Sequence, residues 1–383
     1  MPKKIIMIDP RGRVGKAGGE VIGRHIKYAN TLAAELNCRD ETPLQIYSIS
    51  NCVKEPEIYE SLRIEYIYCP PYNLFRFAKE ISRLLDKLTN TQIALVSGDT
   101  WVSAITARII QKKLCKAIPL QVQCHFDVEN LYSQSKSNLL SILKLLTFKY
   151  FLRVSNQLRL VNGSNASFLI AKYPKQKGKF FIAPSILNIP PLRNQNERST
   201  ELIHIGWVGR FHHERNPSGF VELIKKLDSA GANLRVVLVG EGPLQSRTIS
   251  KLKEINQSLE VVQMGQLAGD DYFTALSSID VLVSTASAES FGRALREGVI
   301  AGCSIWSIET TGFKELRHQL RDDAVRPLFL EKNPDELLSE FQCLAKTRIL
   351  QKSKELLVAE QEHNQKTLIQ SWRSLLDLNK GAR

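Results

Sequence analysis

Short apolar runs alternate with amphipathic segments along most of the chain. In the second half, LIHIGWVGR (202–210), LRVVLVGEG (234–242) and DVLVSTAS (280–287) have the Val, Ile and Leu content of buried strands. Between them, NPSGFVELIKKLDSAG (216–231) and FGRALREGVIAG (291–302) are predicted to be helices. Buried strands that alternate with helices are typical of a parallel sheet covered on both faces. This pattern predicts a doubly wound α/β fold.

The first half shows the same alternation more loosely. KKIIMID (3–9) is predicted to be a strand, and a glycine-rich loop separates it from a helix at 20–36. Further strand candidates are LQIYSIS (44–50), IEYIYCP (64–70), TQIALVSG (91–98), PLQVQCH (119–125), LRLVNGS (158–164) and KFFIAPS (179–185). The polar stretch 188–200, with its pair of prolines, indicates a linker between the halves.

We therefore expect two doubly wound Rossmann-like domains that face a central cleft, the first at 1–190 and the second at 200–360. After residue 331 the pattern turns helical, and the terminal segment 361–383 is predicted to form a helix that packs back on the first domain. Ligands of such sheets bind at the carboxyl ends of the strands. The loops that follow strands are therefore the places to look for a site.

Composition narrows the class of protein. With 43% hydrophobic and 24% charged residues, the chain has the apolar content of a globular protein with proper cores. No apolar run reaches the roughly 18 residues of a membrane span. The start, MPKKIIMIDP, lacks the apolar core of a signal peptide. Seven cysteines without a CxxC pair favour free thiols in a cytoplasmic protein over disulfides or a zinc site.

The net charge of +13 lies entirely in residues 1–190, and residues 191–383 are neutral overall. It is densest at 104–179, where basic residues outnumber acidic ones by 11. Such a segment attracts polyanions, which include nucleic acid, phosphorylated substrates and an anionic bilayer. A solvated basic surface that serves only solubility is the simpler alternative.

The loop DPRGRVGKAGG (9–19) does not have the GxGxxG spacing of a dinucleotide site. Glycines between a strand and a helix let the backbone approach a ligand, and the helix N-terminus that follows favours an anion. A flexible turn is the alternative. The loop holds the glycines Gly12, Gly15, Gly18 and Gly19 and the basic residues Arg11, Arg13 and Lys16.

Two turns after strands of the second half carry candidate binding groups. Arg210 and Arg215, in GWVGRFHHERNP, suit a diphosphate because guanidinium groups bind phosphate in a bidentate manner; ordinary surface arginines are the alternative. The adjacent histidines of this stretch do not have metal-ligand spacing. The second turn consists of Gly240, Glu241, Gly242 and Pro243. We expect it to lie beside a nucleotide base, and a plain tight turn is the alternative.

The stretch AESFGRALREG brings two carboxylates to the start of a predicted helix. We expect Ser290 to cap a helix that begins at Phe291, so that the amides of Phe291 and Gly292 can receive a phosphate. Glu289 and Glu297 can each accept hydrogen bonds from vicinal hydroxyls of a sugar ring. The alternatives are a favourable interaction of Glu289 with the helix dipole and an i,i+4 salt bridge from Glu297 to Arg293.

The order of these motifs, with IETTGFKEL (308–316) after them, resembles the group 1 family of retaining glycosyltransferases with the GT-B fold. The resemblance covers most of the chain and is strongest over 202–316. It implies that Glu297 holds the ribose hydroxyls of a nucleotide and that Glu289 holds hydroxyls of the transferred sugar. It also implies that Arg210 and Arg215 bind the diphosphate, with the amides of 291 and 292. The family usually has lysine where this chain has Arg215.

In the first domain, Gly18 and Gly19 match the glycine loop of the family, and His125 matches a histidine that lies near the reacting sugar. The residues expected to act in catalysis are Glu289, His125, Arg210 and Arg215. The resemblance implies retention of configuration by front-face attack. The chain has no DxD pair, so neither a metal nor another cofactor is expected beside the nucleotide-sugar substrate.

The acceptor is expected on the first domain, as a glycan or a lipid-diphosphate-linked sugar. In the segment 135–154, Leu139, Ile142, Leu143, Leu146 and Tyr150 form one stripe, with Leu140, Leu145, Phe148, Phe151 and Leu152 on the other side and basic residues between. This segment is either a core helix with basic ends or a helix at an anionic membrane surface. The second choice predicts a cytoplasmic protein bound to the inner face of the membrane.

The leading hypothesis is therefore a nucleotide-sugar glycosyltransferase of surface polysaccharide or glycolipid synthesis. The alternative is a non-catalytic nucleotide-sugar-binding scaffold subunit that docks a partner at the membrane, which would show no donor turnover with any acceptor. A nucleic-acid-binding protein is suggested by charge alone, without a recognition motif, and nucleic acid is not expected as a partner. A nucleotide-sugar epimerase would convert the donor without an acceptor.

Overall fold

The computed structural model describes residues 2–12, 14, 18–37, 42–69, 73–88, 90–114, 118–136, 138–187, 189 and 202–378. It divides into one unit of residues 1–186 with 363–383 and a second unit of residues 187–362. The predicted linker at 188–200 lies outside the described residues, apart from residue 189. No helix among the described residues is long and apolar enough to span a membrane.

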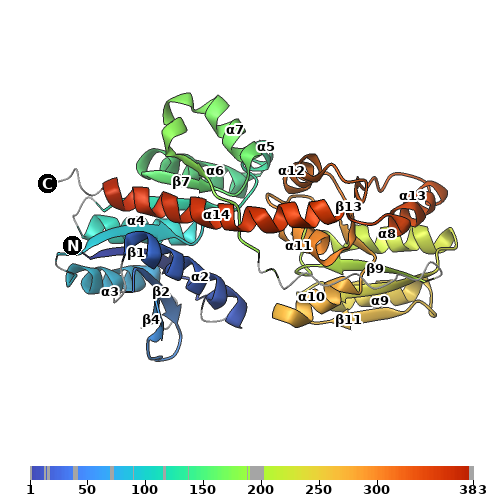
Figure 1. The fold of residues 1–383 in the computed structure, drawn as a ribbon, viewed down its shortest axis with the longest axis horizontal. Helices are drawn as coiled ribbons and strands as arrows, with labels where there is room; N and C mark the ends of the chain where they lie inside the picture. Colours follow the sequence, from blue (N-terminus) through green and yellow to red (C-terminus); the bar gives the residue numbers. More distant parts are fainter. Residues whose placement is uncertain are drawn as a thin grey trace. The chain divides into compact units, whose positions relative to one another are not determined.

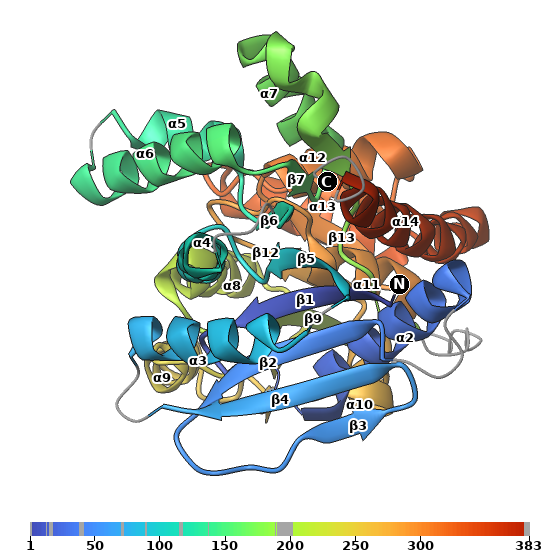
Figure 2. The same cartoon turned by 90° about the vertical axis from the view of Figure 1, so that its left-hand side faces the viewer.

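The first unit contains a sheet of order β3-β4-β2-β1-β5-β6-β7-β8 within the described residues. All of its strand pairs are parallel except the antiparallel pair of β3 with β4. The strands are β1 (Lys3–Asp9), β2 (Leu44–Ser50), β3 (Glu57–Tyr59), β4 (Leu62–Tyr68), β5 (Gln92–Ser97), β6 (Leu120–Cys124), β7 (Gln157–Leu160) and β8 (Phe180–Ile182). Figure 2 shows β4, β2, β1 and β5 side by side in this order.

Helices cover both faces of this sheet, as its alternating side chains require. Ile6 and Ile8 of β1 face one core, and Ile5 and Met7 face the other, because successive side chains of a strand point to opposite faces. The helices are α2 (Gly18–Leu36), α3 (Leu74–Asp86), α4 (Val102–Lys113), α5 (Val128–Gln134), α6 (Leu139–Val154), α7 (Gly163–Lys172), the 3-10 helix η1 (Pro174–Lys179) and the part of α14 (Gln351–Asp377) that follows Glu362. The first core takes residues of α3, α4 and α6, and the second takes residues of α2 and α14.

The end of α14 completes the second of these cores. Leu368, Ile369 and Trp372 are fully buried there beside Tyr28 and Leu32 of α2. The indole nitrogen of Trp372 donates a hydrogen bond to Gln121 at 3.0 Å. The segment from His363 onward is therefore part of the first unit, although about 175 residues of the other unit precede it in the chain.

The second unit contains a fully parallel sheet of order β11-β10-β9-β12-β13-β14 among its described residues. Its strands are β9 (Ile203–Val208), β10 (Leu234–Val239), β11 (Val261–Met264), β12 (Val281–Ser284), β13 (Ser304–Ser307) and β14 (Val325–Pro327). Its helices are η2 (His213–Arg215), α8 (Pro217–Ser229), α9 (Gln245–Ile255), α10 (Gly269–Ser277), α11 (Arg293–Ala301), α12 (Thr311–Leu320) and α13 (Pro334–Lys346) (Figure 1). Two fully buried aromatic residues, Phe220 of α8 and Phe341 of α13, pack in its core.

The α/β fold with doubly wound parallel sheets agrees with the sequence prediction in both halves. Two short strands, β3 and β14, were not predicted. The predicted helix at 291–302 begins two residues later, at Arg293.

Candidate functional site

The order of the second sheet reverses at β9. From β9 the chain proceeds to β10 and β11 on one side, and it returns to place β12, β13 and β14 on the other. The loops after β9 and β12 therefore leave the same edge of the sheet at the topological switch point, which is where open α/β sheets bind ligands.

A salt bridge joins these two loops. Arg215 ends η2, in the loop after β9, and its Nη1 lies 2.6 Å from Oε1 of Glu289, in the loop after β12. The side chain of Glu289 is only 9% exposed, whereas that of Arg215 is 32% exposed. The hydroxyl of Thr285 also donates to the carbonyl of Asn216 at 2.7 Å. The switch point therefore carries a buried acid that faces a partly exposed guanidinium.

The predicted cap of the helix that follows is wrong. Gly292, not Ser290, is the N-cap of α11, and no side chain caps this helix. The backbone of Gly292 is left-handed, with φ of 70°, which glycine adopts without the strain of a Cβ atom. The amides without intrahelical partners therefore begin at Gly292.

Two residues that the sequence reasoning missed hold this glycine turn. A Cβ atom on Gly312 would lie 2.7 Å from the carbonyl carbon of Phe291, so only glycine lets α12 approach the turn. The amide of Gly312 donates to the carbonyl of Glu289 at 2.7 Å. Arg296 is buried on α11, and its Nε donates to the carbonyl of Phe291 at 3.0 Å. Its guanidinium also lies 4.5 Å from the centre of the Phe291 ring.

Glu297 lies on α11 and is 3% exposed. Its Oε1 accepts a hydrogen bond from Nε of Arg293 at 2.7 Å, so the i,i+4 salt bridge considered as the alternative is present. Its Oε2 accepts one from the hydroxyl of Tyr272, on α10, at 2.8 Å. Burial and the charge of Glu297 raise the pKa of Tyr272 well above its ordinary value, so this phenol stays a donor. Each carboxylate oxygen has two lone pairs and can accept more than one hydrogen bond.

The turn after β10 packs closely against the loop after β9. Gly240 has φ of 122°, and a Cβ atom there would lie 2.1 Å from the carbonyl oxygen of Gly209. The amide of Phe211 donates to the carbonyl of Glu241 at 3.0 Å, and a Cβ atom on Gly242 would lie 2.5 Å from the carbonyl oxygen of Phe211. The glycines of this turn therefore serve close packing of two loops, and Pro243, which follows them, is exposed.

Arg210 is placed differently from Arg215. Its side chain is 73% exposed and pairs with Glu214 of the same loop, whereas Arg215 pairs with Glu289. The structure therefore brings Arg215, but not Arg210, into contact with the predicted acids.

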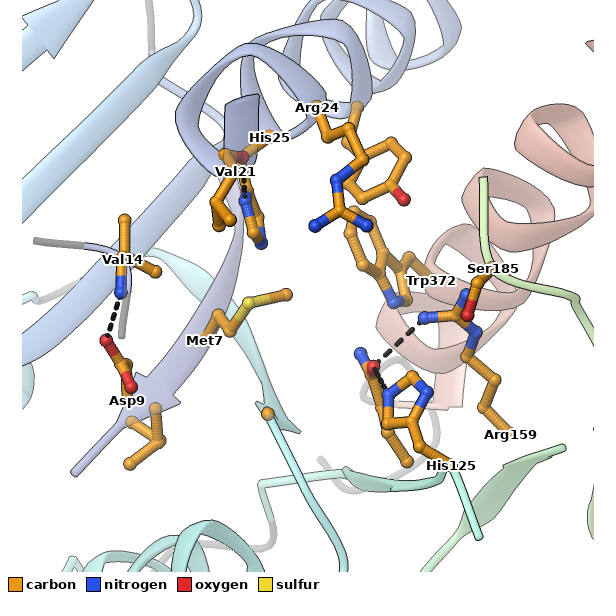
Figure 3. A pocket seen from close by; sticks show the side chains of 14 residues that line it. Met7, Asp9, Val14, Val21, Arg24, His25, His125, Arg159, Ser185 and Trp372 are labelled. Atoms are coloured by element: carbon orange, nitrogen blue, oxygen red, sulfur yellow. Dashed lines mark hydrogen bonds between the residues drawn. The ribbon is translucent and has the colours of Figure 1, made fainter. Parts of the chain in front are cut away.

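In the first unit, α2 begins at Gly18 and Gly19, while Arg13, Gly15 and Lys16 of the same loop lie outside the described residues. His125 is exposed directly after β6, and its Nε2 lies 2.9 Å from Oε1 of Gln123. It borders a cavity of about 460 Å³ at the carboxyl ends of β1, β6 and β7 (Figure 3).

The helix α6 exposes the stripe that its sequence predicts. Leu145, Phe148, Phe151 and Leu152 are buried in the first unit, and Leu140, which was predicted on that side, is exposed. The exposed apolar residues of α6 are Leu139, Leu140, Ile142, Leu143, Leu146 and Tyr150. Between α6 and α4 lies an open hollow of about 450 Å³, which Leu146, Tyr150 and Ile105 help to line. We call these exposed residues of α6, with Ile105, the α6 face.

Among the described residues, no group of three or more His, Cys, Asp or Glu side chains is arranged to hold a metal ion.

A family model matches a stretch within the second unit. Residues 188–321 match the family model for glycosyl transferases, group 1. The chain is 29% identical over 103 residues to the tRNA-queuosine alpha-mannosyltransferase of Drosophila melanogaster, a stretch that covers 26% of this chain and 27% of that protein. It is 28% identical over 101 residues to the 2-deoxystreptamine glucosyltransferase of Streptomyces kanamyceticus, or 26% of each chain. The chain thus matches about a quarter of the length of these curated relatives.

Solved structures resemble the whole chain. The sucrose-phosphate synthase of Thermosynechococcus elongatus has a TM-score of 0.74 at 15% identity and covers 98% of this chain, with all of its own length aligned. Anabaena HepE in complex with UDP-glucose has a TM-score of 0.62 at 12% identity, over 95% of this chain and 99% of that one. At these identities the likeness shows the fold, which is GT-B. Residues 188–321 therefore resemble the group 1 glycosyl transferases, and the whole chain has the GT-B fold.

Proposed function

We propose that this protein transfers a sugar from a nucleotide-diphosphate sugar to a glycan or lipid-linked acceptor with retention of configuration. The observation that carries this proposal is the pair of buried acids, Glu289 and Glu297, on either side of the glycine-capped start of α11, with Arg215 in contact with the first. The complexes of HepE with UDP and UDP-glucose support a nucleotide-sugar donor.

Each group has a task in this proposal. Glu297 holds the ribose hydroxyls, and Glu289 holds hydroxyls of the transferred sugar. Arg215, with Arg210 and the amides at the start of α11, stabilises negative charge on the departing diphosphate, a kind of interaction that typically lowers a barrier by about 2.7–4 kcal/mol per donor. His125 acts beside the reacting sugar. Because these cationic groups and amides suit the leaving group, the proposed reaction needs neither a metal nor another cofactor.

A thermal-shift panel of UDP-, GDP- and ADP-sugars tests donor binding. A donor at about 100 times its dissociation constant should stabilise the protein by about 2.7 kcal/mol. Release of nucleotide that depends on an added acceptor then tests transfer. If no nucleotide sugar raises the melting temperature, the proposal is wrong. Binding without turnover of the donor by any acceptor would favour the scaffold alternative.

We further propose that the α6 face docks on an anionic membrane surface from the cytoplasmic side, where surface glycan or glycolipid precursors would be acceptors. Its exposed leucines lie beside exposed Lys144, Lys149 and Arg153, and no acidic residue occurs from 130 to 196. Each basic residue near anionic lipid contributes about 1 kcal/mol. The exposed leucines favour a lipid surface over nucleic acid as the partner. Binding of nucleic acid through its phosphates requires basic side chains but not exposed leucines.

Flotation with vesicles of phosphatidylglycerol and phosphatidylcholine at low and high salt tests the docking. We expect the protein to float with anionic vesicles at low salt and to dissociate partly at high salt, because screening weakens only the charged part. Failure to float, or binding of RNA in place of vesicles in a competition gel shift, would contradict the proposal.

A further inference from the structure

The cavity of the first unit is lined by more positive charge than the described residues balance. It lies between the carboxyl ends of β1, β6 and β7 on one side and α2 and α14 on the other (Figure 3). Its polar lining side chains include two arginines, Arg24 and Arg159, together with Asp9, His25, His125 and the phenol of Tyr28. Its apolar walls include Trp372 and Val21.

Arg159, on β7, is a buried cation with neutral partners. It is only 4% exposed, and three of its five N–H groups donate to the carbonyls of Ala183 and Pro184 and to Oε1 of Gln123, at 2.8, 3.0 and 2.9 Å. Burial lowers the pKa of its guanidinium. A charge buried without an opposite charge is unfavourable by several kcal/mol, so this arrangement favours an anion from outside the chain.

Two further donors lack a partner at the same cavity. The Nε of Arg24 and the Nε2 of Gln123 are buried, and neither has a hydrogen-bond acceptor within the part of the chain that the structure describes. In Figure 3 the guanidinium of Arg24, from α2, points into the space between His25 and Arg159. The two guanidinium groups repel each other, which adds to the lowering of the pKa of Arg159.

The acid of the cavity is already engaged. Oδ2 of Asp9 accepts hydrogen bonds from the amide of Val14 at 2.9 Å and from the hydroxyl of Ser48 at 2.8 Å. No described contact pairs it with Arg24 or Arg159. The carboxylate of Asp9 therefore holds the loop after β1, and the cationic groups of α2 and β7 are available to a ligand.

His25 completes the cluster as a neutral group. Its Nδ1 lies 2.7 Å from the carbonyl of Val21, and the hydrogen bond assigns the proton to Nδ1. Burial, together with the charges of Arg24 and Arg159, lowers the pKa of His25 to about 4, against the opposing effects of the hydrogen bond to Val21 and the charge of Asp9. The lone pair on Nε2 can accept a hydrogen bond from a hydroxyl.

We propose that this cavity binds a phosphoryl group of the acceptor substrate. A phosphate monoester carries about −1.5 to −2 charges at neutral pH, which matches two guanidinium groups, and its oxygens can accept from Arg24, Arg159 and Gln123 together. The proposal rests on the proposed glycosyl transfer and names its acceptor class. The phosphoryl group belongs either to a free sugar phosphate or to a lipid-linked diphosphate, and the experiment separates these sources.

Calorimetry on the full chain with glucose 6-phosphate, glucose and inorganic phosphate tests this site, as does flotation with vesicles that contain a polyprenyl diphosphate sugar. Binding of glucose 6-phosphate at least tenfold tighter than glucose supports a soluble acceptor. Binding of the polyprenyl diphosphate vesicles beyond matched phosphatidylglycerol vesicles supports a lipid-linked one. If neither preference is observed, the proposal is wrong.

Arg24→Gln provides the matched variant, since Arg24 lies at the cavity rather than in a core. We expect it to weaken binding of the phosphorylated ligand at least tenfold, whereas Arg83→Gln, on the exposed side of α3, leaves it unchanged. The nucleotide-sugar melting shift of Arg24→Gln should equal that of the wild type. If nucleotide sugars do not raise the melting temperature of the wild type, only the donor assignment is wrong. If Arg24→Gln binds the phosphorylated ligand as tightly as the wild type, only the proposed phosphate site is wrong.

A second readout is the NMR titration of His25. A phosphate bound beside this ring favours its protonated form, so the pKa of His25 should rise by one unit or more when inorganic phosphate saturates the site. His204, in the second unit, provides the control resonance. An unchanged pKa of His25 in the presence of a bound phosphorylated ligand would contradict the location.

Discussion

The Arg215 guanidinium lies 2.6 Å from the Glu289 carboxylate, across the two loops that leave β9 and β12. Because the acid is nearly buried and the arginine is partly exposed, the pair keeps a negative charge in place without a bound ligand. A diphosphate would compete with Glu289 for Arg215, and the carboxylate would then be available to sugar hydroxyls. In the function proposed above, the pair would connect recognition of the diphosphate with recognition of the sugar.

Glu289 and Glu297 should differ in which step they affect. We expect Glu297→Ala to weaken nucleotide binding, and Glu289→Ala mainly to lower the rate of transfer, by roughly 100-fold if it removes one charge-stabilising interaction. Calorimetry with the free nucleotide and steady-state kinetics with donor and acceptor separate the two effects. Full activity of both variants would contradict the assignments.

The Arg215–Glu289 pair should show energetic coupling. Arg215→Ala leaves the acid buried without its cation, so it should destabilise the second unit more in the wild-type background than in a Glu289→Gln background. A double-mutant cycle from urea unfolding should give a coupling energy of about 0.5–3 kcal/mol. The matched pair Arg210 and Glu214 is largely exposed and should give roughly 1 kcal/mol or less.

Gly312→Ala should damage the start of α11 through packing alone. Its new Cβ atom would meet the backbone of Phe291 and Gly292 at less than 3 Å, and backbone atoms cannot rotate away. Overpacking of this kind typically destabilises by about 1–3 kcal/mol, and donor affinity should fall with it. Gly178→Ala is the control, since nothing lies within 4 Å of its Cβ position. Thermal melts with and without donor measure both effects, and equal melts for the two variants would refute the argument.

His25 should make stability depend on pH. Its pKa is about 4 in the folded protein and about 6.5 in the unfolded chain, so between these values the unfolded chain binds a proton that the folded protein excludes. The free energy of unfolding should therefore fall as the pH drops from about 6.5 to 4, by up to about 1.4 kcal/mol per pH unit from this group. Urea unfolding of the wild type and of His25→Gln over this range measures the difference. Parallel pH profiles for the two proteins would exclude this role.

The α6 face should be separable from folding. Leu143→Ser and Leu146→Ser change exposed side chains, so the melting temperature should move little while binding to anionic vesicles weakens about tenfold or more. Thr147→Ser, on the same helix, controls for a change that leaves the apolar area nearly intact. Unchanged flotation of the double serine variant would show that the leucines do not contact lipid.

The pattern of apolar residues was sufficient to predict both parallel sheets, because buried strands and amphipathic helices have different periods. The position of the acids after β12 followed from the same pattern, since loops at the carboxyl ends of strands bind ligands. The start of α11 was misplaced because a serine before a helix suggests a cap, whereas the left-handed turn at Gly292 is set by contact with Gly312, twenty residues later.

Other parts of the site depend on contacts between elements. Tyr272 reaches Glu297 from another helix, and nothing in its neighbourhood along the chain marks it. Arg24 and Arg159 belong to a helix and a strand that are 135 positions apart, and each alone is an ordinary basic residue. The one sequence signal is that Arg159 interrupts the apolar residues of the predicted strand at 158–164.

Because Trp372 closes the core behind the cavity of the first unit, that unit needs a segment that is translated after the second unit. The stretch from 187 to 362 emerges first and contains its whole sheet. During translation the first unit therefore cannot complete its core until the segment from His363 onward has been made. A product that stops before this tryptophan would retain the whole second unit but lack one wall of the cavity of the first unit.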